Sequence, residues 1–298
     1  MSLAPAAGLI LVITVLAIAF PGTAERVVNT LQEDVVALFS WYYVLIVAAF
    51  VGFSLWVGLG RYGNIRLGDD DEEPEFSRGA WFAMLFATRM GVGLVFWGVA
   101  EPLSHFNEPK PGVTGEPSRL AELGLAQTYI HWGIHAWAIY AVVGLGLGYA
   151  IHRKGLPVSI RWALVPLLGE RVRGRWGDAI DVAAVVGGTF GIATTLGLGV
   201  LQIGAGTERV GIAETSEVVQ LVIVALITTL AAISVMSGLA KGLKWLSNTN
   251  MLMAAGLLVF VFVTGPTLFL MREFVQSIGT WLTGFLRLTF RRQRVHRG

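Results

Sequence analysis

Long apolar runs separated by short polar stretches dominate the chain. Runs near 20 residues are long enough to cross the hydrocarbon core of a bilayer as helices. The segment after the last run alternates apolar and polar residues at helical spacing, which predicts an interfacial helix over Glu273–Leu288. We therefore expect an all-α integral membrane protein with about seven transmembrane helices. The predicted spans are Leu3–Phe20, Trp41–Gly60, Gly79–Ala100, Leu125–Ile151, Ala179–Ile203, Val218–Met236 and Met251–Met271.

The composition supports this fold class. Hydrophobic residues make up 54% of the 298 residues and charged residues 14%, with a mean hydropathy of +0.66. A soluble domain carries about a quarter charged residues, so a soluble globule and a disordered chain are both excluded. The net charge of +2 gives no reason to expect nucleic acid as a partner. The chain has no cysteine for a disulfide or a thiolate metal site, and its 37 glycines are typical of closely packed membrane helices.

The distribution of Lys and Arg predicts the orientation. With the N-terminus in the cytoplasm, the inner loops hold eleven basic residues and the outer loops five. Basic residues favour the cytoplasmic side of a membrane. We therefore expect a multi-pass protein of the cell membrane with a cytoplasmic N-terminus, the loop Arg153–Arg175 inside and Lys110–Arg119 outside.

The third span contains two glycines one residue apart, in Met90-Gly91-Val92-Gly93. Such a pair can let a helix unwind, and unwound backbone at membrane depth persists only where it lines a cavity or a site. The alternative is that Gly91 and Gly93 only allow close helix packing. Arg89 lies near the middle of the same span, where a charge is costly unless it faces protein or a cavity. A buried acid such as Asp181 is one candidate partner for it.

The fourth span contains three aromatic residues on one helical face. At about 100° per residue, Trp132, Tyr140 and Trp137 fall near 0°, 80° and 140° of one arc. The small residues Gly133 and Ala136 lie between them. Aromatic faces attract quaternary ammonium groups. The alternative is that they are interfacial tryptophans, but those gather at span ends, whereas these residues lie within the span.

Titratable residues near these motifs give weak support for other chemistry. His131 and His135 are four residues apart, but no carboxylate lies nearby on their helix, so we expect hydrogen bonds to neighbouring helices and no metal site. Glu101 and His105 share that spacing, yet Pro102 indicates that the span ends there. No nucleophile motif or phosphate loop accompanies them, so an enzyme is not expected.

The motifs together resemble the betaine/choline/carnitine transporter family. The segment from Met90 to Leu103 resembles the glycine-rich third-helix signature of that family, and His131–Tyr140 resembles its fourth-helix aromatic motif. The resemblance runs from about Trp41 to Leu288 and is closest to the glycine-betaine members. Further support comes from Tyr62–Gly68, Glu73–Ser77, Leu196–Gly204 and Ser247–Asn250.

The resemblance implies twelve spans with a LeuT-type inverted repeat, of which this chain would be the first half. Residues 1–60 would form two N-terminal helices, 79–271 the first five-helix repeat and 273–288 the interfacial helix. It also implies uptake of quaternary ammonium osmolytes, often driven by sodium, by carriers that often form homotrimers in the lipid bilayer. Trp132, Trp137 and Tyr140 would form one side of the substrate site. Backbone carbonyls of Ala87 and Met90 would form half of a sodium site, and no other cofactor is implied.

Three departures from the family pattern matter. Arg89 replaces the usual glycine before the methionine, which makes it a candidate substitute for a bound cation. Gly188 and Ile192 stand where sodium-coupled members carry threonines. The tail 291–298 resembles nothing in the family, and no eighth span follows, so we expect a C-terminally truncated chain that is inactive alone.

Two functions from different classes remain open on the sequence. The first is a secondary active transporter of glycine betaine or a related osmolyte, probed by accumulation of labelled betaine. The second is a non-transporting membrane fragment that only binds or interacts, which saturable binding without uptake would indicate.

Overall fold

The computed structural model describes residues 3–68, 71, 73–89, 92–110, 113–238 and 242–290, and within them it contains helices and turns and no strand. This confirms the all-α fold class. In chain order the longer helices are α1 (Leu3–Ala19), α2 (Pro21–Leu59), α3 (Arg78–Arg89), α4 (Val92–Asn107), α5 (Pro117–Trp132), α6 (Ile134–Gly148), α9 (Arg175–Arg209), α10 (Glu217–Met236), α11 (Lys244–Thr264) and α12 (Thr267–Thr289). Between α6 and α9 lie a π-helical turn at Tyr149–Arg153, the short helices α7 (Ile160–Ala163) and α8 (Val165–Leu168), and a 3-10 turn at Gly169–Arg173.

Five helical segments within the described residues are long and apolar enough to cross a membrane: 21–59, 117–153, 175–209, 217–236 and 244–264. The helix α1 is apolar but has only 17 residues. Most large apolar side chains on these segments are exposed, as at Ile192 and Leu258, each 72% exposed. Apolar surface of this extent fits contact with lipid or with further helices.

The N-terminal region differs from the prediction. The sequence suggested a polar connection between the first two spans, but α2 begins at Pro21 and continues for 39 residues. Proline at the first helical position is pre-organised for a helix, and the polar stretch that follows is rich in helix formers such as Glu25, Leu31 and Gln32. At 1.5 Å per residue, α2 is about 58 Å long, so only part of it fits the hydrocarbon core.

The third predicted span consists of two helices in the described residues, α3 and α4. Its end was predicted at Ala100, with Pro102 as the stop signal, but α4 continues through Pro102 to Asn107. Proline removes one backbone donor, which neighbouring side chains and helices can offset in membrane helices. The hydroxyl of Ser104 bonds the carbonyl oxygen of Ala100 at 2.9 Å in this stretch.

The seventh predicted span ends earlier than expected. The helix α11 stops at Thr264 and α12 begins at Thr267, because Gly265-Pro266 interrupts the helix. The predicted interfacial helix is therefore the larger part of α12.

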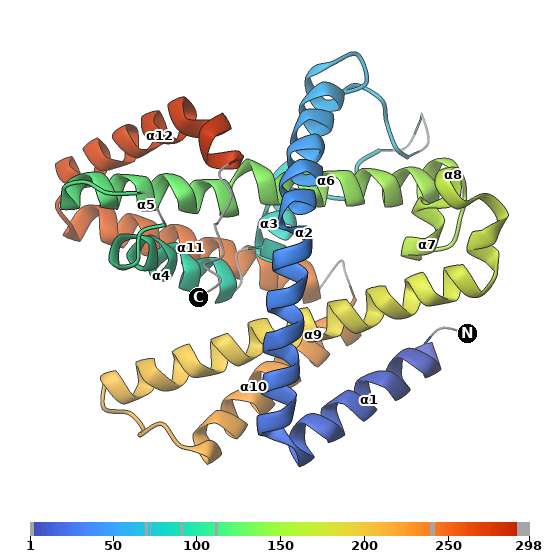
Figure 1. Ribbon diagram of the computed structural model, residues 1–298, viewed down its shortest axis with the longest axis horizontal. Helices are drawn as coiled ribbons and strands as arrows, with labels where there is room; N and C mark the ends of the chain where they lie inside the picture. Colours follow the sequence, from blue (N-terminus) through green and yellow to red (C-terminus); the bar gives the residue numbers. More distant parts are fainter. Residues whose placement is uncertain are drawn as a thin grey trace.

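The helix α5 is the centre of the packing that positions the site. It contacts α4 on one side and α12 on another, and Figure 1 shows α12 (red) running alongside α5 (green). Ala126 and Ile130 of α5 form a buried cluster with Leu288 of α12. The hydroxyl of Tyr129 also lies 3.0 Å from that of Ser277 on α12.

The connection between α6 and α9 is fixed by one arginine. Arg161 of α7 donates to Asp181 at 2.6 Å and to Asp178 at 2.7 Å, both on α9. Ser159 also donates to Asp181, at 2.5 Å. The bond to Asp178, followed by that to Asp181, raises the pKa of the Arg161 guanidinium above its usual range, so this clamp stays charged.

Candidate functional site

The three predicted aromatic residues lie on two helices that meet at Gly133. Trp132 is the last residue of α5, whereas Trp137 and Tyr140 belong to α6. Gly133 has φ −90° and ψ −135°, which is not helical, so the arc calculated for one regular helix does not apply across it.

Trp137 and Tyr140 are brought together. Their ring centroids lie 6.3 Å apart with the planes tilted by 52°. The two residues are 39% and 45% exposed, respectively. Two exposed aromatic faces at this separation can both contact one trimethylammonium group.

Trp132 lies against α4. Its indole N–H donates to Oε2 of Glu101 at 2.6 Å. At the other edge of the ring, a Cβ placed on Gly93 would lie 3.7 Å from Cη2 of Trp132. The second glycine of the third-span motif and Glu101 therefore both position this tryptophan.

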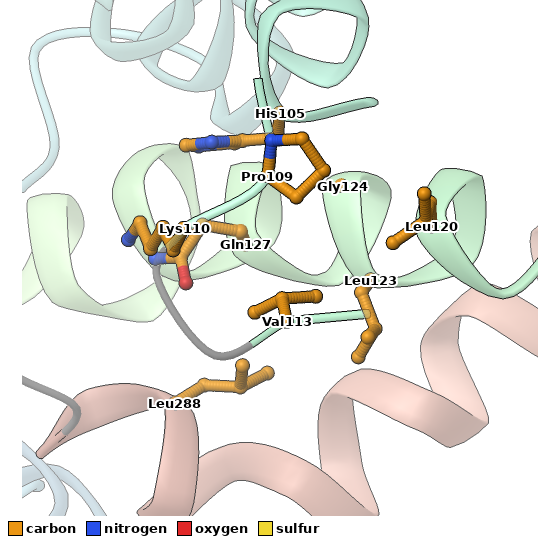
Figure 2. A pocket seen from close by; sticks show the side chains of 9 residues that line it. All are labelled: His105, Pro109, Lys110, Val113, Leu120, Leu123, Gly124, Gln127 and Leu288. Atoms are coloured by element: carbon orange, nitrogen blue, oxygen red, sulfur yellow. The ribbon is translucent and has the colours of Figure 1, made fainter. Parts of the chain in front are cut away.

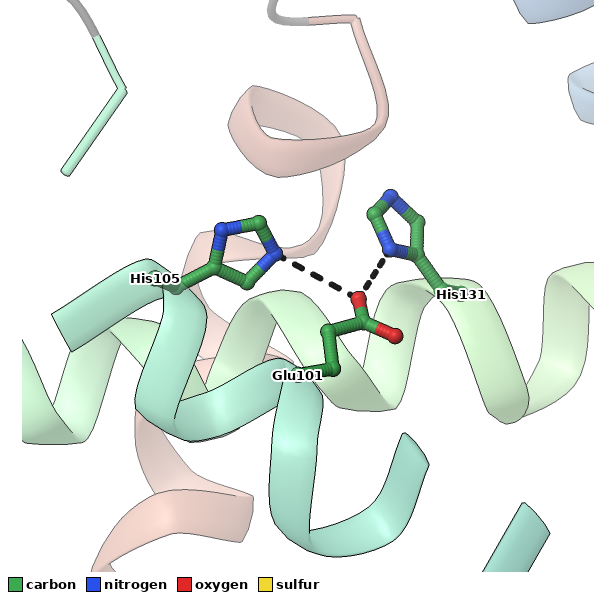
Figure 3. A group of neighbouring side chains, drawn as sticks. All are labelled: Glu101, His105 and His131. Carbon is green, nitrogen blue, oxygen red and sulfur yellow. Dashed lines mark hydrogen bonds and ion pairs between the residues drawn. The ribbon is translucent and has the colours of Figure 1, made fainter. Parts of the chain in front are cut away.

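Glu101 is the centre of a polar cluster between α4 and α5. The residue is 8% exposed, and its Oε1 lies 3.3 Å from Nε2 of His105. The same oxygen is in close contact with Nδ1 of His131 (Figure 3). The other nitrogen of His131, Nε2, lies 3.1 Å from the Gln127 amide nitrogen. Every described polar atom of the Glu101 carboxylate is thus engaged.

Only part of this cluster could be predicted from the sequence. The spacing of Glu101 and His105 is visible in the chain, but His131 joins them only because α4 and α5 pack side by side. The expectation that both span-four histidines bond to neighbouring helices is confirmed: His131 contacts Glu101 of α4, and His135 lies 3.0 Å from the Thr289 hydroxyl of α12.

A small cavity opens beside this cluster. Its volume is about 30 Å³, room for about one water molecule. Figure 2 shows His105 and Gln127 at one end of it, together with Lys110 from the connection between α4 and α5.

The predicted ion-binding residues are only partly described. Ala87 is half-buried in α3. Met90, Gly91 and the side chain of Arg89 lie outside the described residues, so unwinding at Met90 and Gly91 and the charge substitute stay predictions, whereas the prediction of unwound backbone is wrong for Gly93. Gly93 lies in the first turn of α4 and is helical.

Asp181, and three threonines that lie near Gly188 and Ile192 on α9, form hydrogen bonds within their own region. Asp181, the candidate partner of Arg89, is bonded to Arg161 and Ser159. The hydroxyls of Thr189, Thr194 and Thr195 donate to carbonyls four residues earlier in α9.

Comparison with known proteins defines the class. The family model "BCCT, betaine/carnitine/choline family transporter" matches residues 2–298, so the chain belongs to this family. It is 43% identical to the glycine betaine transporter OpuD of Bacillus subtilis over 271 residues, which is 91% of this chain and 53% of that protein.

Other relatives give the same picture. The chain is 40% identical to a glycine betaine transporter of Acinetobacter baylyi over 272 residues, covering 91% of this chain and 41% of that protein. It is 47% identical to an uncharacterised transporter of Mycobacterium tuberculosis over 281 residues, with 93% and 47% covered. The chain spans about half the length of the curated relatives it matches.

Proposed function

We propose that this chain supplies one repeat of a secondary active carrier that takes up glycine betaine or a related quaternary ammonium osmolyte. Relatives named as glycine betaine transporters support the substrate class. The observation that carries the proposal is the exposed pair of Trp137 and Tyr140 on α6. A trimethylammonium group has no hydrogen-bond donor, so an aromatic face recognises it through the ring quadrupole, at about 0.5–2 kcal/mol per contact.

Transport itself requires a second, inverted repeat in this proposal. Alternating access arises when two repeats move against each other around a shared site. A second copy of these 298 residues would insert with the same orientation, because the same basic loops set it. It would therefore not supply the inverted partner.

In this proposal the sodium site, like the substrate site, is formed by both repeats. The carbonyls of Ala87 and Met90 would supply two ligands, too few to replace the hydration shell of sodium. The rest of the shell would come from the second repeat. Arg89 directly precedes Met90 in the chain, so we propose that its positive charge partly replaces a bound cation and that uptake depends only weakly on sodium.

The test is uptake of labelled glycine betaine in a bacterial host that lacks its own betaine uptake. The 298-residue chain would be expressed alone and joined to the second repeat of a family member. We expect accumulation only from the joined protein. Accumulation by the chain alone, abolished by Trp137→Ala, would contradict the need for a second repeat. Saturable binding without uptake in the joined protein would instead support a non-transporting binding fragment.

A further inference from the structure

Three potential metal ligands converge between α4 and α5. Oε1 of Glu101, Nε2 of His105 and Nδ1 of His131 all lie within 4.8 Å of one another. Glu101 and His105 come from one face of α4, and His131 comes from α5 across the helix pair (Figure 3). The cluster adjoins the aromatic residues through the bond from Trp132 to Glu101, but none of its three side chains belongs to the Trp137–Tyr140 pair.

The ligand types and their spacing fit a zinc-type ion. Two histidine nitrogens and one carboxylate oxygen are a common zinc ligand set, with bonds of about 2.0–2.2 Å. Around a tetrahedral ion such bonds place ligand atoms about 3.3–3.5 Å apart. The separation of Glu101 and His105 is 3.3 Å already. The side chain of His131 is 44% exposed and has room to move back from the carboxylate.

Side chains that can hold the three ligand residues in place by hydrogen bonds are also present. In metal sites, the far nitrogen of a histidine ligand and the second oxygen of a carboxylate ligand are usually held by hydrogen bonds. Here the indole N–H of Trp132 holds Oε2 of Glu101 at 2.6 Å and leaves Oε1 toward the histidines. Gln127 lies 3.1 Å from Nε2 of His131 and can present its amide oxygen to that nitrogen. A simple ion pair between a glutamate and a histidine needs neither of these partners.

Room for about one water molecule lies beside the cluster. His105 and Gln127 line the water-sized cavity beside it (Figure 2). We propose that Glu101, His105 and His131 form a binding site for a divalent transition-metal ion of the zinc type, with water in the fourth position. The ion ties α4 to α5 through ligands from both helices.

The test is metal binding by the purified chain, which requires a tag without histidines. After treatment with a chelator, the protein in detergent is titrated with Co²⁺ and then with Zn²⁺. We expect one Co²⁺ per chain, with the intense visible absorption of a tetrahedral site, and its displacement by Zn²⁺. The absence of a tetrahedral Co²⁺ spectrum at one equivalent would overturn the proposal.

Variants separate this site from adventitious binding. His105→Gln and His131→Gln should each remove the tetrahedral spectrum and weaken Zn²⁺ binding more than a hundredfold. Gln127→Leu, which removes only an outer partner, should weaken Zn²⁺ binding about 10–100-fold. The matched control is His152→Gln, because His152 is exposed in the π-helical turn and outside the cluster. Equal Zn²⁺ affinity in His131→Gln and His152→Gln would overturn the proposal. Elution and helical content identical to the parent chain verify that each variant is folded.

Discussion

The close approach of α4 to α5 gives a testable prediction about Gly124 on α5. A Cβ built on Gly124 would lie 2.9 Å from the Pro102 carbonyl oxygen and 3.5 Å from Cβ of His105, both on α4. A backbone carbonyl cannot rotate away as a side chain would, so Gly124→Ala forces α4 and α5 apart. Gly144→Ala on α6 is the matched control, because a Cβ there meets nothing within 4 Å.

The magnitude comes from two opposing terms. Replacing a helical glycine by alanine gains about 0.8–1.0 kcal/mol in helix propensity at both positions. Overpacking a close contact costs about 1–3 kcal/mol, and this cost applies only at Gly124. Gly144→Ala should therefore stabilise the chain by about 1 kcal/mol. Gly124→Ala should be less stable than Gly144→Ala by about 1–3 kcal/mol.

The assay is thermal unfolding of the purified chain in detergent. Unfolding is measured as the loss of monodisperse protein after heating. All variants are heated at one rate, because membrane proteins often unfold irreversibly and the apparent midpoint then depends on that rate. We expect the midpoint to order as Gly144→Ala, then the parent chain, then Gly124→Ala. A midpoint for Gly124→Ala equal to or above that of Gly144→Ala would refute the close contact between α4 and α5.

Three further predictions concern orientation, the α7–α9 clamp and the ion site. Because the chain has no native cysteine, Ser118→Cys should react with an impermeant thiol reagent added to intact cells and Arg173→Cys should not; labelling of Arg173→Cys from outside would reverse the orientation. Arg161→Met removes both charge-assisted bonds to α9, of which the one to Asp181, whose side chain is 12% exposed, is worth about 1.5–3 kcal/mol, so the apparent melting temperature should fall; an unchanged midpoint would show that the clamp contributes nothing. In the protein with two repeats, Arg89→Gly should make betaine uptake steeply sodium-dependent; a steep requirement already present with Arg89 and unchanged by the substitution would contradict its role as a charge substitute.

Much of the helical organisation was readable in the sequence because apolar length alone determines it. The fifth and sixth predicted spans lie within α9 and α10, and the fourth lies within the segment from α5 to the π-helical turn. The predicted helix boundaries were less accurate near prolines, where a local stop signal competes with the helix propensity of the surrounding residues. Pro21, which follows the first predicted span, starts a helix. Pro102, taken as a stop signal, lies inside a helix, whereas Pro266, which the seventh predicted span included, separates two helices.

The sequence predicted only those contacts of the site that lie within one regular helix. The Trp137–Tyr140 pair lies on α6 at a spacing of three residues, so its proximity follows from helical geometry. The position of Trp132 does not, because the backbone at Gly133 departs from the helix. The pairing of Glu101 with His131 joins residues 30 positions apart, and no local pattern specifies which face of α5 meets α4.

In the proposed function, aromatic faces on α6 recognise the quaternary ammonium group. The most direct test compares Trp137→Phe with Trp137→Ala in the protein with two repeats, by the concentration of glycine betaine that gives half-maximal uptake. Phenylalanine keeps a ring face and alanine removes it, so we expect a much larger increase for Trp137→Ala, about 5–30-fold for a contact of about 1–2 kcal/mol. Equal half-maximal concentrations for the two variants, at equal amounts of protein in the membrane, would show that the ring of Trp137 does not recognise the substrate.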